Sequence, residues 1–121
     1  MSLFDVFDVA GSGMRAQSLR LNTVSSNLAN AGGVAGRPDD VYRSRYPVFA
    51  PTALGDDPSV VGVAVQRIVE GTEPAEKRYQ PDHPQADETG HVYAATVNTI
   101  ESMVDMLSAA RSYQNLSLIH I

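Results

Sequence analysis

The hydrophobic pattern is helical at both ends of the chain and interrupted in the middle. Over residues 2–30 the two core positions of a heptad recur about four times. These positions hold Leu3, Phe7, Ala10, Met14, Gln17, Leu21, Val24 and Leu28. The pattern predicts one α-helix about 40 Å long, and a single helix cannot bury its own apolar stripe.

Individual capping and glycine residues add detail to the prediction of this first helix. Ser2 is placed to cap it, with Asp5 three residues later in a capping-box-like position. Gly11 and Gly13 each cost about 1 kcal/mol against alanine within a helix. Two explanations stay open for them: the close approach of another backbone, or a kink.

A second helical pattern begins near Val97. Its apolar positions are Val97, Ile100, Val104 and Leu107, and Arg111 takes the next position of the same stripe. We expect the two terminal helices to pack together or against neighbouring subunits, because neither can bury its stripe alone.

The segment between the helices is rich in turn residues and short extended runs. Prolines and glycines predict a loop over 31–59, with one extended piece from Tyr42 to Phe49. The run Val60–Val69 alternates like a strand, and Lys77–Tyr79 and His91–Ala94 are shorter candidates. We therefore predict an α+β fold, with a long N-terminal helix pairing with a C-terminal helix in a coiled-coil-like manner and a small β-rich middle. The expected parts are a helix at 1–30, a linker at 31–59, a β-rich segment at 60–96 and a helix at 97–115.

The last six residues, 116–121, break the C-terminal pattern. Their sequence LSLIHI is also the translation of the end of a common transposon-based sequencing adapter. We expect these residues to be an artefactual tail and the C-terminal helix to be truncated near Asn115.

Composition excludes several classes of function. The net charge of −5 argues against nucleic acid or an anionic membrane surface as the main partner. The chain has no cysteine, so a disulfide framework and a thiolate metal site are both excluded. The opening MSLFDVFDVAG lacks the basic start and apolar core of a secretory signal, and no stretch reaches the ~20 apolar residues of a membrane span.

Residues that could carry chemistry are few. His83, Asp87 and His91 lie near one another in the sequence, but their spacing matches no zinc pattern and the segment is turn-like. Gly11-Ser12-Gly13 follows no strand and lacks the lysine of a phosphate-binding loop. We expect no catalytic residue, no metal and no cofactor, and solvated loop residues are the favoured interpretation of the histidines.

The terminal patterns are similar to those of a known family. The stretch MSLFDVFDVAGSGMRAQSLRLNTVSSNLANAGG, with its Asn27-Leu28-Ala29-Asn30 core, resembles the N-terminus of bacterial flagellar basal-body rod proteins, the proximal rod proteins in particular. The second half agrees, through Tyr79-Gln80-Pro81 and the run from Ala110 to Gln114. The resemblance extends over nearly the whole chain to about Asn115.

This resemblance implies a structural role without an enzyme activity or a small-molecule substrate. Its implied partners are other rod proteins, copies of the chain itself and the flagellar type III export apparatus, which would deliver it to the periplasmic rod without a cleaved signal. We expect the assembly interface to lie on both helices. It comprises Phe7, Ala10, Gly11, Met14, Leu21, Val24, Asn27, Leu28, Asn30, Val97, Ile100, Val104, Leu107 and Arg111.

Two alternatives remain beside this interpretation. The chain could be another flagellar axial protein or a secreted helical adaptor, or an enzyme using His83, Asp87 and His91, which rests on residue types alone. Within NLANAGG, Asn30 and the following glycines suit a left-handed helix C-cap. Asn27 lies one turn earlier, and we expect its amide to fix the register between helices of neighbouring subunits.

Overall fold

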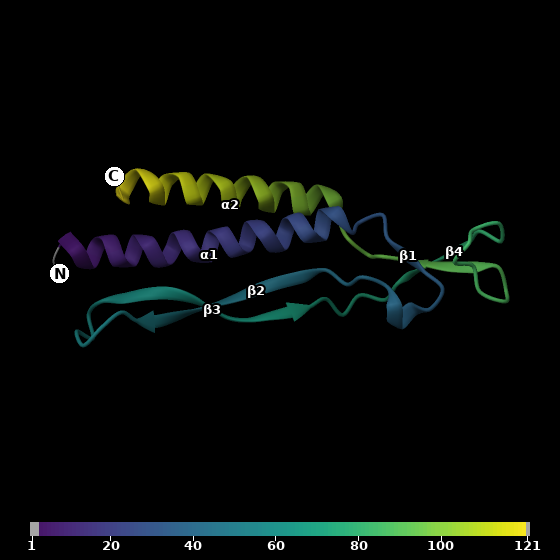
Figure 1. The fold of residues 1–121 in the computed structure, drawn as a ribbon, viewed down its shortest axis with the longest axis horizontal. Helices are drawn as coiled ribbons and strands as arrows, with labels where there is room; N and C mark the ends of the chain where they lie inside the picture. Colours follow the sequence, from purple (N-terminus) through teal and green to yellow (C-terminus); the bar gives the residue numbers. More distant parts are fainter. Residues whose placement is uncertain (1–2, 121) are drawn as a thin grey trace.

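The computed structural model describes residues 3–120 and arranges them in three elongated layers beside a small sheet (Figure 1). Helix α1 (Leu3–Ala29) is the middle layer. It contacts helix α2 (Thr99–His120) on one side and the strands β2 (Arg45–Ala53) and β3 (Val61–Glu70) on the other. The two helices are antiparallel, so both chain ends lie at the same end of the molecule (Figure 1). The predicted α+β fold with packed terminal helices is confirmed.

Helix α1 runs without interruption through Gly11 and Gly13. The proposed cap residue Ser2 lies outside the described residues. At the other end, Ala31 donates its N–H to the Leu28 carbonyl at 3.2 Å, and Gly33 donates to the Asn30 carbonyl at 3.1 Å. These are tight right-handed turns, because among the described residues only Gly55 and Gly90 have a positive φ. The prediction of a left-handed cap at Asn30 and the glycine pair is therefore wrong.

Strands β2 and β3 form an antiparallel hairpin whose register runs from Arg45 opposite Glu70 to Ala53 opposite Val61, with an irregularity after Val48. The extended piece predicted from Tyr42 to Phe49 corresponds to β2, which begins three residues later, at Arg45, and continues four residues further, to Ala53. Pro47 and Pro51 lie within this strand. A proline has no N–H to donate, and a strand of a two-stranded sheet tolerates it because one edge has no strand partner.

A second sheet lies at the end opposite to the chain termini (Figure 1). It has the strand order β1 (Val34–Ala35), β5 (His91–Ala94), β4 (Glu76–Tyr79), and both pairings are antiparallel. A short 3-10 turn, η1 (Pro38–Asp40), follows β1. Val92 in the central strand is fully buried, so this sheet has a small core of its own. The predicted extended segments at 77–79 and 91–94 are confirmed.

Helix α2 begins two residues after the predicted start. Asn98 caps it, because its Oδ1 accepts the Glu101 N–H at 3.1 Å. The helix then continues through residues 116–120, so the expected break in the pattern at Leu116 does not end the helix.

Neither helix, over the residues that the structure describes, is both long and apolar enough to cross a membrane.

Candidate assembly surfaces

The two helices meet along a seam of small and polar side chains. Asp105 of α2 forms an ion pair with Arg20 of α1, and both side chains are more than half buried. Ala109 is completely buried. Nearer the chain ends, a Cβ added to Gly13 would lie 3.0 Å from a methyl of Leu116. The neighbour at Gly13 is thus a side chain of α2 and not a second backbone, and α1 continues as one helix through both glycines.

The predicted apolar stripe of α2 lies on the opposite side of the helix from this seam. Ile100 is 75% exposed, Val104 62% and Leu107 72%, and Met103 beside them is also exposed. These positions are three or four residues apart and form one continuous face. Within one chain, α1 therefore contacts the opposite face of α2, and Ile100, Val104 and Leu107 do not contribute to that contact.

The predicted interface positions on α1 and around α2 fall into three groups. Ala10, Val24 and Asn27 are buried within the chain. A second group is half-buried: Phe7, Gly11, Met14, Leu21, Leu28 and Val97. Asn30 and Arg111 are exposed, like the apolar face of α2. The structure therefore brings part of the predicted stripe of α1 into its own core and leaves that of α2 on the surface.

Asn27 is only 2% exposed and has three hydrogen-bonding partners within the chain. Its Nδ2 donates to the Arg45 carbonyl at 2.9 Å, and its Oδ1 accepts the Arg45 N–H at 2.9 Å and the Tyr42 hydroxyl at 2.6 Å. The expected role of this amide between neighbouring subunits is corrected: it joins α1 to the start of β2. Asn30 donates to the Ser26 carbonyl at 2.8 Å within its own helix end.

Ser12 makes a corresponding contact in the first half of α1. Its hydroxyl donates to the Val9 carbonyl at 2.7 Å and accepts the N–H of Val63 in β3 at 3.1 Å. Gly62, beside Val63, is buried, and a Cβ there would lie 2.6 Å from both the Ser12 Oγ and a methyl of Leu54. The backbone of β3 thus lies so close to α1 at Gly62 that a side chain there would clash with Ser12.

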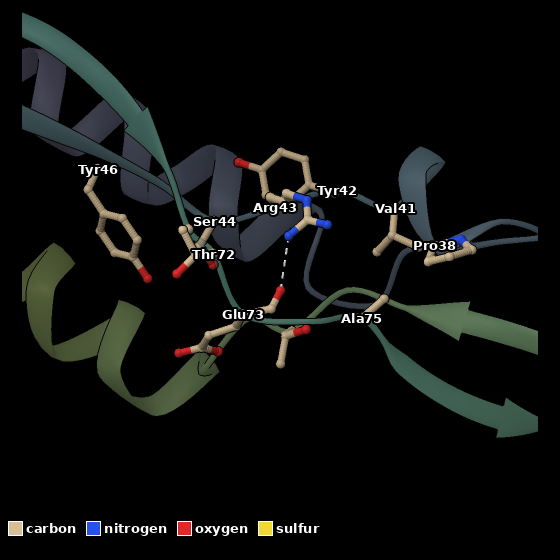
Figure 2. A pocket seen from close by; sticks show the side chains of 11 residues that line it. Pro38, Val41, Tyr42, Arg43, Ser44, Tyr46, Thr72, Glu73 and Ala75 are labelled. Atoms are coloured by element: carbon tan, nitrogen blue, oxygen red, sulfur yellow. Dashed lines mark hydrogen bonds between the residues drawn. The ribbon is translucent and has the colours of Figure 1, made fainter.

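A cavity of about 220 Å³ lies where the helical layers meet the small sheet (Figure 2). Figure 2 shows the Arg43 guanidinium pointing to the Glu73 carbonyl, to which it donates at 3.1 Å. The residues that line the cavity are Pro38, Val41, Tyr42, Arg43, Ser44, Tyr46, Gly71, Thr72, Glu73, Ala75 and Thr96. Most of these residues belong to the segments 38–46 and 71–75, which connect the hairpin with the small sheet. The cavity therefore lies at the junction between the two parts of the molecule.

The segment with His83, Asp87 and His91 is a tight loop held by one carboxylate. Asp87 Oδ1 accepts the N–H and the hydroxyl of Thr89, at 2.9 and 2.7 Å, and the N–H of His91 at 2.9 Å. The hydrogen bond from the His91 backbone, followed by that from the Thr89 hydroxyl, lowers the pKa of Asp87 below its usual value. His83 Nδ1 accepts the Gln85 N–H at 3.0 Å. Within residues 3–120, no three histidine or acidic side chains are grouped as metal ligands.

Sequence reasoning missed the residues that join the layers: Ser12, Arg20, Asp105 and Ala109. A signal for the helical seam was present, because Ser102, Asp105, Ala109 and Ser112 recur at helical spacing. Small residues at such spacing favour close helix packing, and they lie on the face opposite to the larger apolar side chains. No comparable signal predicts Ser12, since its partner is the backbone of a distant strand.

Comparison with known proteins places these surfaces in a family. The model described as "Flagella basal body rod protein" matches residues 7–36, and that described as "Flagellar basal body rod FlgEFG protein C-terminal" matches residues 88–117. The flagellar basal-body rod protein FlgC of Salmonella typhimurium is 41% identical over 114 residues, which cover 94% of this chain and 84% of the relative.

FlgC proteins of other bacteria give the same result. FlgC of Aquifex aeolicus is 41% identical over 117 residues, with the same coverage of both chains. That of Borreliella burgdorferi is 33% identical over 130 residues, which cover 94% of this chain and 86% of the relative. The chain therefore belongs to the FlgC family of flagellar basal-body rod proteins and is a structural subunit of the rod.

Proposed function

We propose that the subunit joins the rod through the exposed apolar face of α2, which binds helices of its own copies and of other rod proteins. One observation carries this proposal. Ile100, Met103, Val104 and Leu107 are each more than half exposed on the side of α2 that faces away from α1. In Figure 1, α2 is an outer layer with no element covering that side.

The chemistry of this face suits a helix partner. Its side chains are large and aliphatic, and Arg111 continues the same row toward the C-terminal end. Burying an exposed apolar side chain of this size contributes about 1.5–3 kcal/mol. A row of four therefore provides a substantial driving force for association.

The half-buried side chains of α1 belong to the same proposal. Phe7, Met14, Leu21 and Leu28 retain apolar surface that a neighbouring helix can cover. Delivery by the flagellar type III export apparatus and a position in the periplasmic part of the rod are also proposed, and they rest on membership of the family.

Val104→Asp in the full-length gene tests the proposal, with Val104→Ile as its matched control. Because Val104 is 62% exposed, we expect the charge to change the stability of the free subunit by less than about 0.5 kcal/mol. Placing the charge against an apolar partner is costly, so rods and motility should be lost. Val104→Ile should assemble normally. Rods of normal length and number with Val104→Asp would contradict the proposed surface.

A further inference from the structure

We infer that Arg20 and Asp105 are positioning residues whose ion pair determines which face of α2 the subunit's own α1 occupies in the packed rod subunit. The opposite face of α2, with its large apolar side chains, is thereby left uncovered by α1. This role belongs to the two helices once they are packed, whether they become ordered before or during assembly. It also holds whether or not the outer face of α2 is the assembly surface proposed above.

Burial of apolar area alone does not select the face of α2 that α1 contacts. The inner face, toward α1, combines small residues such as Ala109 with two larger apolar side chains, the half-buried Met106 and Leu116. The outer face has four large apolar side chains, each more than half exposed: Ile100, Met103, Val104 and Leu107. Because the free energy of burial grows with apolar area, α1 would gain at least as much by packing against the outer face. Another interaction must therefore favour the inner one.

The ion pair connects the inner face of α2 to α1. Arg20 Nη2 donates to Asp105 Oδ1, and the two side chains are only 23% and 32% exposed. Gln17, one turn earlier on α1, accepts a hydrogen bond from Arg20 Nη1 at 3.2 Å and so restricts the guanidinium. The ion pairs within the sheets have side chains that are about half exposed. Solvent therefore weakens the attraction less at the helical seam than in the sheets.

The charges of α2 make the alternative arrangement unfavourable. Between Thr99 and His120 the acids are Glu101 and Asp105, and the only lysine or arginine is Arg111. By helical spacing Asp105 belongs to the inner face, Arg111 continues the outer row, and Glu101 lies to the side of both. With α1 against the outer face, Arg20 would lie among apolar side chains, away from Asp105 and in a row whose charged residue is also a cation.

A charge that is buried without its counter-charge is strongly disfavoured, whereas a half-buried ion pair itself adds little to stability. The Arg20–Asp105 pair therefore acts mainly by excluding the wrong face of α2. Charges that penalise incorrect partners in this way are a common source of specificity between helices.

Charge reversal and charge exchange in the full-length gene test the inference, in cells that have no other copy of it. Arg20→Asp and Asp105→Arg should each lower the number of rods in isolated basal bodies by about tenfold, because each places like charges together at the seam. Carrying both substitutions in one subunit should restore rods and motility to within about twofold of the parent, since the pair is formed again with its charges exchanged. Rod numbers are normalised to the amount of subunit on immunoblots.

Arg20→Lys and Asp105→Glu are the matched controls, because they keep the charge at the same positions, and both should assemble like the parent. Normal rod numbers in both single reversals would overturn the inference. So would an exchanged subunit as deficient as the single reversals, the result expected if the two side chains only fill space, or controls that fail as the reversals do. Normal rods with Val104→Asp beside a successful exchange would contradict the proposed outer surface alone.

Discussion

Asn27 and Asp87 use a single polar side chain to organise backbone that has no regular partner. Asn27 binds Arg45, 18 residues further along the chain, and Asp87 binds Thr89 and His91 within its own loop. The sequence predicted that Asn27 does more than end a helix, but it could not predict the partner. Arg45 lies beyond a run of glycine and proline, and the path of such a segment depends on tertiary contacts. Asp87, in contrast, is a local turn, and the sequence correctly favours a loop there.

The pKa of Asp87 leads to a prediction at this scale. The folded loop lowers this pKa, so its contribution to stability is present above the unfolded value of about 3.9 and is lost as pH falls through the folded value. We expect exchange of the Thr89 and His91 amides to accelerate in that acidic range. NMR titration of the carboxyl carbon with amide exchange would measure both.

Asp87→Ala should abolish this pH dependence and accelerate exchange at both amides at neutral pH. Asp82→Ala, an exposed change in the same segment, is the control and should leave the two amides unaffected. An Asp87 carboxyl that titrates at or above the ordinary value would contradict the geometry of the loop.

Helix α2 presents two different faces, and this determines how far its sequence could be interpreted. The helical spacing of Ile100, Val104 and Leu107 correctly predicts a helix with an apolar face. This spacing shows that the face needs a partner, but it does not say whether the partner belongs to the same chain. The face toward α1 instead has Asp105 and Ala109, whose burial depends on the close approach of another helix. Strand β2 was predicted only in part, because Pro47 and Pro51 indicate a loop unless the free edge of the strand is known.

The close approach of the hairpin to α1 gives a prediction for Gly62. In Gly62→Ala the new methyl would lie 2.6 Å from the Ser12 oxygen and a Leu54 methyl, so the strand or these two side chains must shift. We expect a loss of about 1–3 kcal/mol in the free energy of unfolding. Urea denaturation followed by circular dichroism measures it.

Gly32→Ala is the matched control, because a Cβ there meets no atom within 4 Å and the residue does not have a positive φ. Its stability should be unchanged or slightly increased. Equal effects of the two substitutions would show that the hairpin is not packed against α1 in the way described.

The whole molecule is a layered structure in which one helix is enclosed and the other is not. Helix α1 lies between α2 and the hairpin, while α2 is exposed on its outer side (Figure 1). The general architecture could be predicted from the sequence, since two terminal stripes and a polar middle permit few arrangements. The order of the layers could not, because Ser12 and Asn27 bind distant backbone groups and Gly62 gives space to side chains far away in the sequence. As a rod subunit, the chain thus presents a row of exposed apolar side chains on the outer side of α2.

Chemical labelling of Leu107→Cys tests the central claim, the burial of the outer face of α2 on assembly, most directly. This position is 72% exposed, and the chain has no other cysteine. A maleimide should label it rapidly in the purified free subunit, at nearly the rate measured in denaturant. In isolated basal bodies containing the same subunit, labelling should be strongly suppressed and should return when the rod is dissociated. Equally rapid labelling in the free subunit and in the assembled rod would contradict the account.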